Sequence, residues 1–140
     1  MPLHLLLAED EEIAAENLAF LLRKRLKNHD LHLHLARGGK EALDIVAGSP
    51  DISVAVLDVR MPGMDGIELT HRLRLTRPDL ECIMLSGYDT PVCRMECRRW
   101  GARAFLSKPA RIEDLVGAIE EAARAHDARP VCSGAGVSLS

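Results

Sequence analysis

Short apolar runs and stretches of helical periodicity alternate about five times along the chain. The apolar runs cover residues 3–8, 31–36, 52–57, 82–85 and 104–106. Between them, apolar residues recur every three or four positions, as they do on the buried face of a helix. Strands that alternate with helices of this length predict a parallel sheet covered by helices on both faces, the α/β class.

The helices are predicted from their apolar faces and from the glycines and prolines around them. The first helix has a stripe of Ala14, Leu18, Leu21 and Leu22, and the last has Leu115, Ala118, Ile119 and Ala122. Gly38 and Gly39 are expected to precede the second helix, and Pro62, Gly63 and Gly66 to form a loop before the third. Pro78 should end the third helix and Gly101 the fourth.

The strands differ in their expected burial. Residues 54–57 and 82–85 are continuously apolar, as in strands that are covered on both sides. Residues 31–36 alternate between apolar and polar, which predicts an edge strand with one solvated face. His32 and His34 share that face and could suggest a metal-binding pair. A solvated edge is the favoured interpretation, because the sequence shows no third ligand.

Length and composition narrow the classes of protein to consider. A chain of 140 residues predicts one domain, expected at 1–128, with 129–140 as a flexible tail or the start of a linker. With 18 basic and 21 acidic residues, a strongly basic nucleic-acid binder is not expected. No apolar run is long enough to span a membrane or to act as a signal peptide. Four cysteines at irregular spacing predict free thiols and a cytoplasmic protein.

Chemically useful side chains follow the predicted strands at their carboxyl ends, where parallel sheets bind ligands. They are Glu9 and Asp10 after the first strand, Asp58 after the third, Ser86 after the fourth, and Lys108 followed by Pro109 after the fifth. Three carboxylates at one edge repel each other unless a cation intervenes. Mg²⁺ is the expected ion, because it binds carboxylates and phosphate oxygens, and a lysine supplies a charge for a phosphoryl group.

Four motifs in this order resemble the receiver domain of two-component response regulators. They are "LLLAEDEE", "VAVLDVRMPGMDGIEL", "IMLSGYD" and "GARAFLSKP", and the resemblance covers about residues 3–125. It implies a flavodoxin-like, doubly wound sheet of five strands in the order 2-1-3-4-5 with five helices. This order agrees with an edge position for the second strand.

The resemblance also implies a role for each residue. Asp58 would accept a phosphoryl group from a phosphohistidine of a sensor histidine kinase or phosphotransfer protein. Mg²⁺ would bind Glu9, Asp10, Asp58 and the main-chain carbonyl of Arg60. Ser86 would bind a phosphoryl oxygen and Lys108 would pair with the phosphoryl group. Phe105 would be the switch aromatic, and the Lys108–Pro109 peptide bond would be cis.

Two departures from the commonest family pattern keep the chemistry of the site. The acidic pair is Glu-Asp rather than Asp-Asp, so one carboxylate has a longer stem. Ser86 replaces the frequent threonine and retains its hydroxyl group. The same site could slowly hydrolyse the acyl phosphate formed on Asp58. The chain is expected to assist its own phosphorylation and dephosphorylation without being a conventional turnover enzyme.

Two other functions are compared with that of a receiver domain phosphorylated at Asp58. A receiver that has lost phosphorylation would be an interaction module, but such a protein usually lacks the acceptor, the acidic pair or the lysine. A phosphatase of the haloacid-dehalogenase type also uses a nucleophilic aspartate. That chemistry needs an acidic residue two positions after the nucleophile, where this chain has Arg60.

The output is expected at the surface of the fourth helix, fifth strand and fifth helix, toward an effector that the sequence does not identify. Phosphoryl oxygens on Asp58 would draw Ser86 inward, and the ring of Phe105 could then become buried in the space that Ser86 leaves. This surface carries basic residues (Arg94, Arg98, Arg99 and Arg103) and acidic residues (Glu113, Asp114, Glu120 and Glu121). They predict either two solvated faces or a two-fold dimer in which each basic helix meets an acidic one. Cys93 and Cys97 share a helical face, where packing is favoured over zinc binding, and Trp100 is expected to pack.

Overall fold

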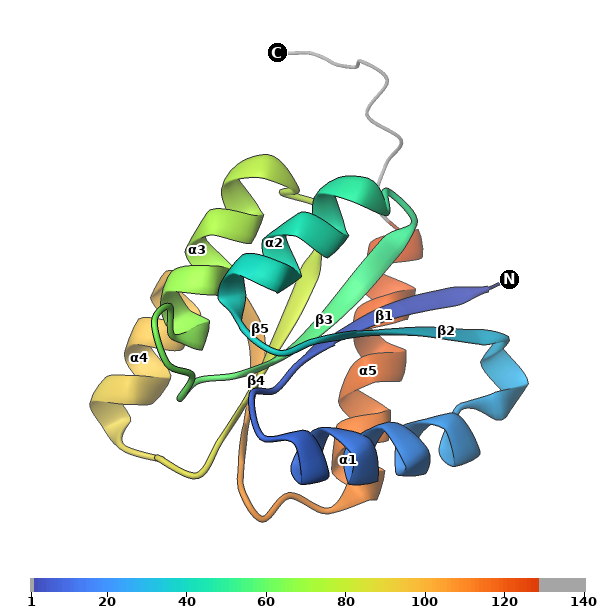
Figure 1. Ribbon diagram of the computed structural model, residues 1–140, viewed down its shortest axis with the longest axis horizontal. Helices are drawn as coiled ribbons and strands as arrows, with labels where there is room; N and C mark the ends of the chain where they lie inside the picture. The colour runs from blue at the N-terminus through green and yellow to red at the C-terminus, as the bar shows by residue number, and fades with distance from the viewer. Residues whose placement is uncertain (1, 129–140) are drawn as a thin grey trace.

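The computed structural model describes residues 2–128, which form a five-stranded parallel sheet in the order β2-β1-β3-β4-β5 (Figure 1). The predicted tail at 129–140 lies outside the described residues. The strands are β1 (Leu3–Ala8), β2 (Leu31–Ala36), β3 (Ile52–Asp58), β4 (Glu81–Ser86) and β5 (Ala102–Ser107). The helices are α1 (Glu12–Arg25), the short 3₁₀ helix η1 (Lys27–His29), α2 (Gly39–Gly48), α3 (Gly66–Thr76), α4 (Pro91–Arg99) and α5 (Ile112–Asp127). The predicted sheet order is confirmed.

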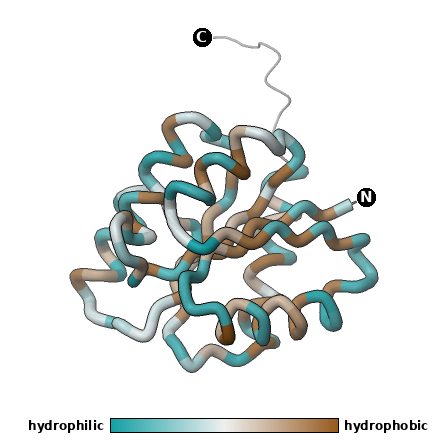
Figure 2. Tube along the Cα trace, in the orientation of Figure 1, coloured by the Kyte–Doolittle hydropathy of each residue, from teal (hydrophilic) through white to brown (hydrophobic). Residues whose placement is uncertain are grey.

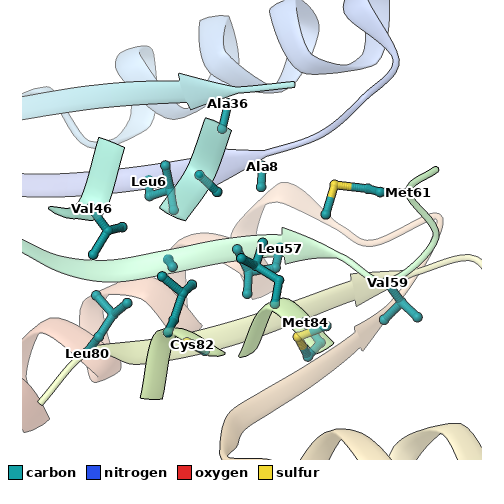
Figure 3. Close-up of a cluster of buried hydrophobic side chains, with 14 of the residues drawn as sticks. Leu6, Ala8, Ala36, Val46, Leu57, Val59, Met61, Leu80, Cys82 and Met84 are labelled. Carbon is teal, nitrogen blue, oxygen red and sulfur yellow. The ribbon is translucent and has the colours of Figure 1, made fainter. Parts of the chain in front are cut away.

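Helices cover both faces of the sheet, and each face has its own apolar core. The helices α2, α3 and α4 pack on one face over Leu6, Leu57 and Met84. The helices α1 and α5 pack on the other face over Leu5 and Val56. Every residue of β3 and β4 is buried, and the middle of the sheet is mostly brown in the centre of Figure 2. Figure 3 shows part of the core beneath α2, α3 and α4.

The strand β2 is an edge strand, as its alternating sequence predicts. Its burial is incomplete at every position except Ala36, and it pairs with β1 on one side only. Within residues 2–128 no helix is both long enough and apolar enough to cross a bilayer.

The predicted buried face of α1 is confirmed at Leu22 but is wrong by about one position along the rest of the helix. Its buried residues are Ala15, Ala19 and Leu22, whereas Leu21 is 37% exposed. Apolar side chains occur around much of this helix, and Phe20 is 64% exposed, so periodicity alone did not single out one stripe. The small alanines let the helix approach the sheet closely. The stripe predicted for α5 is confirmed, with Leu115, Ile119 and Ala122 buried.

The ends of the helices follow local backbone chemistry. Gly39 and Gly66 begin α2 and α3 rather than preceding them. The Asp65 carboxylate accepts a hydrogen bond from the Glu68 N–H and caps the start of α3. Helix α3 ends two residues before Pro78, as predicted. Gly101 follows the end of α4 with a φ of 107°, a left-handed conformation that favours glycine.

Glycine at position 66 is required because the start of α3 lies directly on the end of β3. A Cβ at this position would clash with the backbone carbonyl oxygen of Asp58 and would approach Met84 Cε to 2.8 Å. We expect Gly66→Ala to lower the free energy of unfolding by about 1–3 kcal/mol, the usual cost of overpacking. In the matched control Gly117→Ala, the Cβ meets open space on α5, and helix propensity predicts a gain of about 0.5–1 kcal/mol. Urea unfolding checks both values, and equal effects of the two variants would contradict this packing.

Candidate functional site

Three carboxylates converge at the carboxyl end of the sheet. Glu9 and Asp10 directly follow β1, and Asp58 is the last residue of the neighbouring β3. One oxygen atom from each carboxylate lies within 4.8 Å of the others. Glu9 and Asp58 are buried, at 5% and 8% exposure. Buried carboxylates this close repel each other and need compensating positive charge.

Lys108 supplies part of that charge. It directly follows β5, and its Nζ donates to Glu9 Oε1 at 3.1 Å and to Asp58 Oδ2 at 3.3 Å. Partial burial disfavours the ammonium, but the Asp58 charge and the hydrogen bond to Glu9 outweigh it and raise the Lys108 pKa. The Lys108 N–H also donates to the Ser86 carbonyl at 2.7 Å, and the Lys108–Pro109 peptide bond is cis.

Main-chain N–H groups hold the two buried carboxylates from the other side. The Arg60 N–H donates to Asp58 Oδ1 at 3.2 Å, and the Glu11 N–H donates to Glu9 Oε2 at 3.2 Å. Each carboxylate therefore has one oxygen facing Lys108 and one facing a backbone donor. These two donors could not be predicted from sequence, because any residue type other than proline can provide a main-chain N–H.

The arrangement of charges fits a small divalent cation. Three carboxylates face one ammonium, so the site carries about two excess negative charges. Among the described residues, the Asp10 carboxylate has no hydrogen-bond or ion-pair partner, although it lies within reach of Glu9 and Asp58. An all-oxygen donor set of this kind suits a hard ion such as Mg²⁺.

Ser86 lies on the neighbouring strand. Leu85 is the register partner of Asp58, so Ser86 is one position further along β4. Its side chain is fully buried. Its Oγ accepts from the Tyr88 N–H at 2.9 Å and donates to the Tyr88 carbonyl at 3.3 Å. The hydroxyl group thereby holds the start of the β4–α4 loop.

Comparison with known proteins assigns the chain to a family. A sequence model described as "Response regulator receiver domain" matches residues 5–120. The chain belongs to the response regulator receiver domain family. Response regulators receive the signal in two-component systems.

Relatives and solved structures agree with this assignment. Response regulator MprA from Mycolicibacterium vanbaalenii is 36% identical over 117 residues, covering 83% of this chain and 48% of that protein. The uncharacterized transcriptional regulatory protein YesN from Bacillus subtilis is 32% identical over 118 residues, covering 84% of this chain and 31% of that protein. This receiver chain thus spans half or less of the length of both curated relatives. The crystal structure of a receiver domain protein from Clostridium thermocellum superposes with a TM-score of 0.80 at 25% identity, covering 87% and 94% of the two chains.

In this receiver domain Phe105 is half-buried and covered, rather than exposed. The Arg94 guanidinium lies 4.7 Å above the centre of its ring. Asp89 Oδ1 accepts a hydrogen bond from Arg94 Nε at 2.5 Å, and Asp89 Oδ2 accepts one from the Ser107 hydroxyl group. Further burial of Phe105 would therefore gain less than the ~1.5–3 kcal/mol of a fully exposed ring. The burial of Phe105 expected from sequence is therefore already partly complete.

Most charges of the predicted dimer surface already have partners within the receiver chain. Arg94 pairs with Asp89, Arg99 with Glu96, Arg103 with Glu81, Glu113 with Arg25, and Glu120 with His29. A second copy of the chain that paired with these charges across a two-fold axis would therefore have to displace the ion pairs within each copy.

The cysteines of the receiver domain lie in its core, as predicted for packing. Cys93 and Cys97 are buried on the inner face of α4. Burial and the adjacent Cys93 raise the pKa of the Cys97 thiol to about 12, so it stays protonated at neutral pH. Trp100 packs its ring edge against His71, with ring centres 4.5 Å apart.

The histidines contain a grouping that the sequence analysis missed. His4 of β1 lies against His32 and His34 of β2. Partial burial, with the neighbouring His4 and His32, lowers the pKa of His34. His32 and His34 on the edge strand β2 therefore have a third histidine, His4, beside them.

Proposed function

We propose that this receiver domain is switched by transfer of a phosphoryl group onto Asp58. The observation that carries the proposal is the environment of Asp58. Its carboxylate is held by the Arg60 N–H and Lys108, next to two further carboxylates. The donor is a phosphohistidine on a sensor histidine kinase or phosphotransfer protein.

In the transfer, an Asp58 oxygen forms a bond to phosphorus while the bond from phosphorus to the donor histidine nitrogen breaks. The imidazole leaves and takes a proton, and Asp58 becomes an acyl phosphate. Lys108 is placed to neutralise negative charge on the phosphoryl oxygens, and the Ser86 hydroxyl to donate to one of them. Glu9, Asp10, Asp58 and the Arg60 carbonyl would hold Mg²⁺, which offsets charge on the transferring group. The contribution of the protein is positioning and electrostatics.

Two alternatives predict different behaviour. An interaction module without phosphorylation would accept no phosphoryl group, although the acceptor, the acidic pair and the lysine are all present. A phosphatase of the haloacid-dehalogenase type needs an acid where Arg60 stands. The Arg60 side chain is exposed, and its guanidinium lies 4.9 Å from the centre of the Tyr88 ring.

The described cysteines are free thiols, consistent with a reducing cytoplasm, where we place the protein.

Incubation with acetyl phosphate separates these readings. We expect the intact mass to rise by one phosphoryl group when Mg²⁺ is present, and to remain unchanged when EDTA removes divalent ions. The same preparation should not turn over p-nitrophenyl phosphate. Repeated hydrolysis of that ester would favour the phosphatase, and absence of any mass increase would favour the interaction module.

The signal would leave the site through the β4–α4 loop. Ser86 holds Tyr88, and Asp89 in the same loop holds Arg94 and Ser107. A phosphoryl oxygen that attracts Ser86 would compete with its bonds to Tyr88. The loop would then release Arg94 from Asp89, and the Phe105 ring, no longer held under the guanidinium, could turn further inward.

A released Arg94 would be free to bind an acidic helix of a second copy. We therefore expect phosphorylation to shift the receiver domain from monomer toward dimer, more at low salt than at high salt. Sedimentation of the phosphorylated protein at about 100 μM, at both salt concentrations, checks this. A monomer under both conditions would leave this surface to an effector of a different kind.

A further inference from the structure

Three of the six histidines lie together on one face of the sheet edge. His4 and His32 are register partners on β1 and β2, and His34 follows on the same face of β2. The His4 and His32 rings stack with centres 4.4 Å apart and an angle of 9°. The centre of the His34 ring is 5.6 Å from that of His4. Parallel pairing of two strands that both begin Leu-His-Leu creates this cluster.

Two ring nitrogens of this cluster have the spacing of ligands on one metal ion. His4 Nδ1 and His34 Nε2 are 3.3 Å apart. Two imidazole nitrogens, each about 2.0–2.1 Å from a tetrahedral Zn²⁺, lie roughly 3.3–3.4 Å from each other. This distance also allows an N–H···N hydrogen bond between the rings. The donor ring becomes a ligand when its proton moves to its other nitrogen, the second neutral tautomer.

We propose that His4, His34 and His32 form a binding site for a divalent transition-metal ion such as Zn²⁺. His4 and His34 supply the preformed pair of ligands. His32 supplies the third after its ring turns out of the stack, because stacked parallel rings direct their nitrogens side by side rather than toward one point. Half of the His32 side chain is exposed, which leaves room for this rotation.

Asp30 supports His32 in this role. Asp30 directly precedes β2, and its Oδ1 lies 3.7 Å from His32 Nε2. This distance is longer than a hydrogen bond, which would form only as the His32 ring turns. A carboxylate that accepts the second ring N–H of a ligating histidine fixes the orientation of the ring and makes it a better ligand. A water molecule would complete a tetrahedral set, as in sites with three protein ligands.

This site is separate from the acidic site in both place and chemistry. His4 lies near the start of β1, and Glu9 follows the end of that strand. Imidazole nitrogens suit Zn²⁺, Ni²⁺ and Cu²⁺, whereas the carboxylate oxygens suit Mg²⁺. A bound ion would tie the edge strand β2 to β1 through side chains, in addition to their backbone pairing.

The first experiment titrates Zn²⁺ into the intact protein with Mg²⁺ in excess and follows the imidazole nitrogens by NMR. The rings of His4, His32 and His34 should shift together and saturate at one equivalent, while His29, His71 and His126 stay unchanged. A shift of the latter three instead, or no shift at all, would overturn the proposal. Saturation of His4 and His34 without His32 would overturn the three-ligand set.

The second experiment measures Zn²⁺ affinity by calorimetry in a Glu9→Gln/Asp10→Asn background, so that the acidic site does not contribute. His34→Gln and His32→Gln should each weaken Zn²⁺ binding at least about tenfold, because loss of a ligand should cost at least as much as loss of a group that only orients a ligand. The matched control His71→Asn should leave the affinity unchanged. His32 is exposed, so its variant should fold normally, and an unfolding midpoint measured in EDTA checks this. Equal affinity in all three variants would overturn the proposal.

Discussion

Replacing Asp58 with asparagine is expected to abolish phosphoryl incorporation from acetyl phosphate. The amide keeps the size of the side chain and can still accept from the Arg60 N–H. It lacks the nucleophilic oxygen, so no acyl phosphate can form. Intact-mass measurement should show one added phosphoryl group on the parent protein and none on Asp58→Asn.

The matched control is Asp51→Asn. Asp51 is exposed and directly precedes β3, at the opposite end of the strand from Asp58. This variant should accept a phosphoryl group as the parent protein does. Continued labelling of Asp58→Asn would show that another residue is the acceptor, and loss of labelling in both variants would point to an effect on the fold.

The second large effect is expected from the acidic pair. The double variant Glu9→Gln/Asp10→Asn should accept a phosphoryl group at least about a hundredfold more slowly, because a metal ion contributes several kcal/mol to stabilising transition-state charge. Its labelling rate should also lose its dependence on Mg²⁺ concentration. Stopped reactions at a series of Mg²⁺ concentrations, quantified by intact mass, measure both effects. An unchanged Mg²⁺ dependence would contradict the assignment of these residues.

The single variants of the pair should differ in stability when divalent ions are absent. Asp10→Asn removes an unpaired carboxylate and relieves repulsion of Asp58, so the free energy of unfolding should rise. Glu9→Gln also relieves repulsion, but it loses the charged hydrogen bond from Lys108. Repulsion among the three carboxylates, taken alone, would make both changes stabilising. The structure confines that expectation to Asp10, and urea unfolding in EDTA compares the two variants.

The sheet and the convergence of Glu9, Asp10, Asp58 and Lys108 could be predicted because they follow from pattern and topology. Continuous apolar runs identify β3 and β4, and alternation identifies the edge strand β2. Parallel strands bring their carboxyl ends to one edge, so polar residues after different strands must lie near each other. The buried face of α1 was harder to predict, because apolar residues such as Phe20 and Leu21 also occur outside it.

Other features of the site depend on contacts that residue types do not reveal. The Arg60 N–H is a backbone group, and its bond to Asp58 depends on the turn after β3. Arg94 covers Phe105 only because Asp89 holds the guanidinium in place. The position of His4 beside His32 depends on the register between β1 and β2, which pattern alone did not specify.

The most direct test of the central claim locates the modified residue in the parent protein. After incubation with acetyl phosphate and Mg²⁺, borohydride reduction converts an aspartyl phosphate into homoserine, which peptide mass spectrometry can place in the sequence. We predict homoserine at position 58 and at no other aspartate. A phosphorylated protein with homoserine elsewhere, or with none, would contradict the assignment of Asp58 as the phosphoryl acceptor.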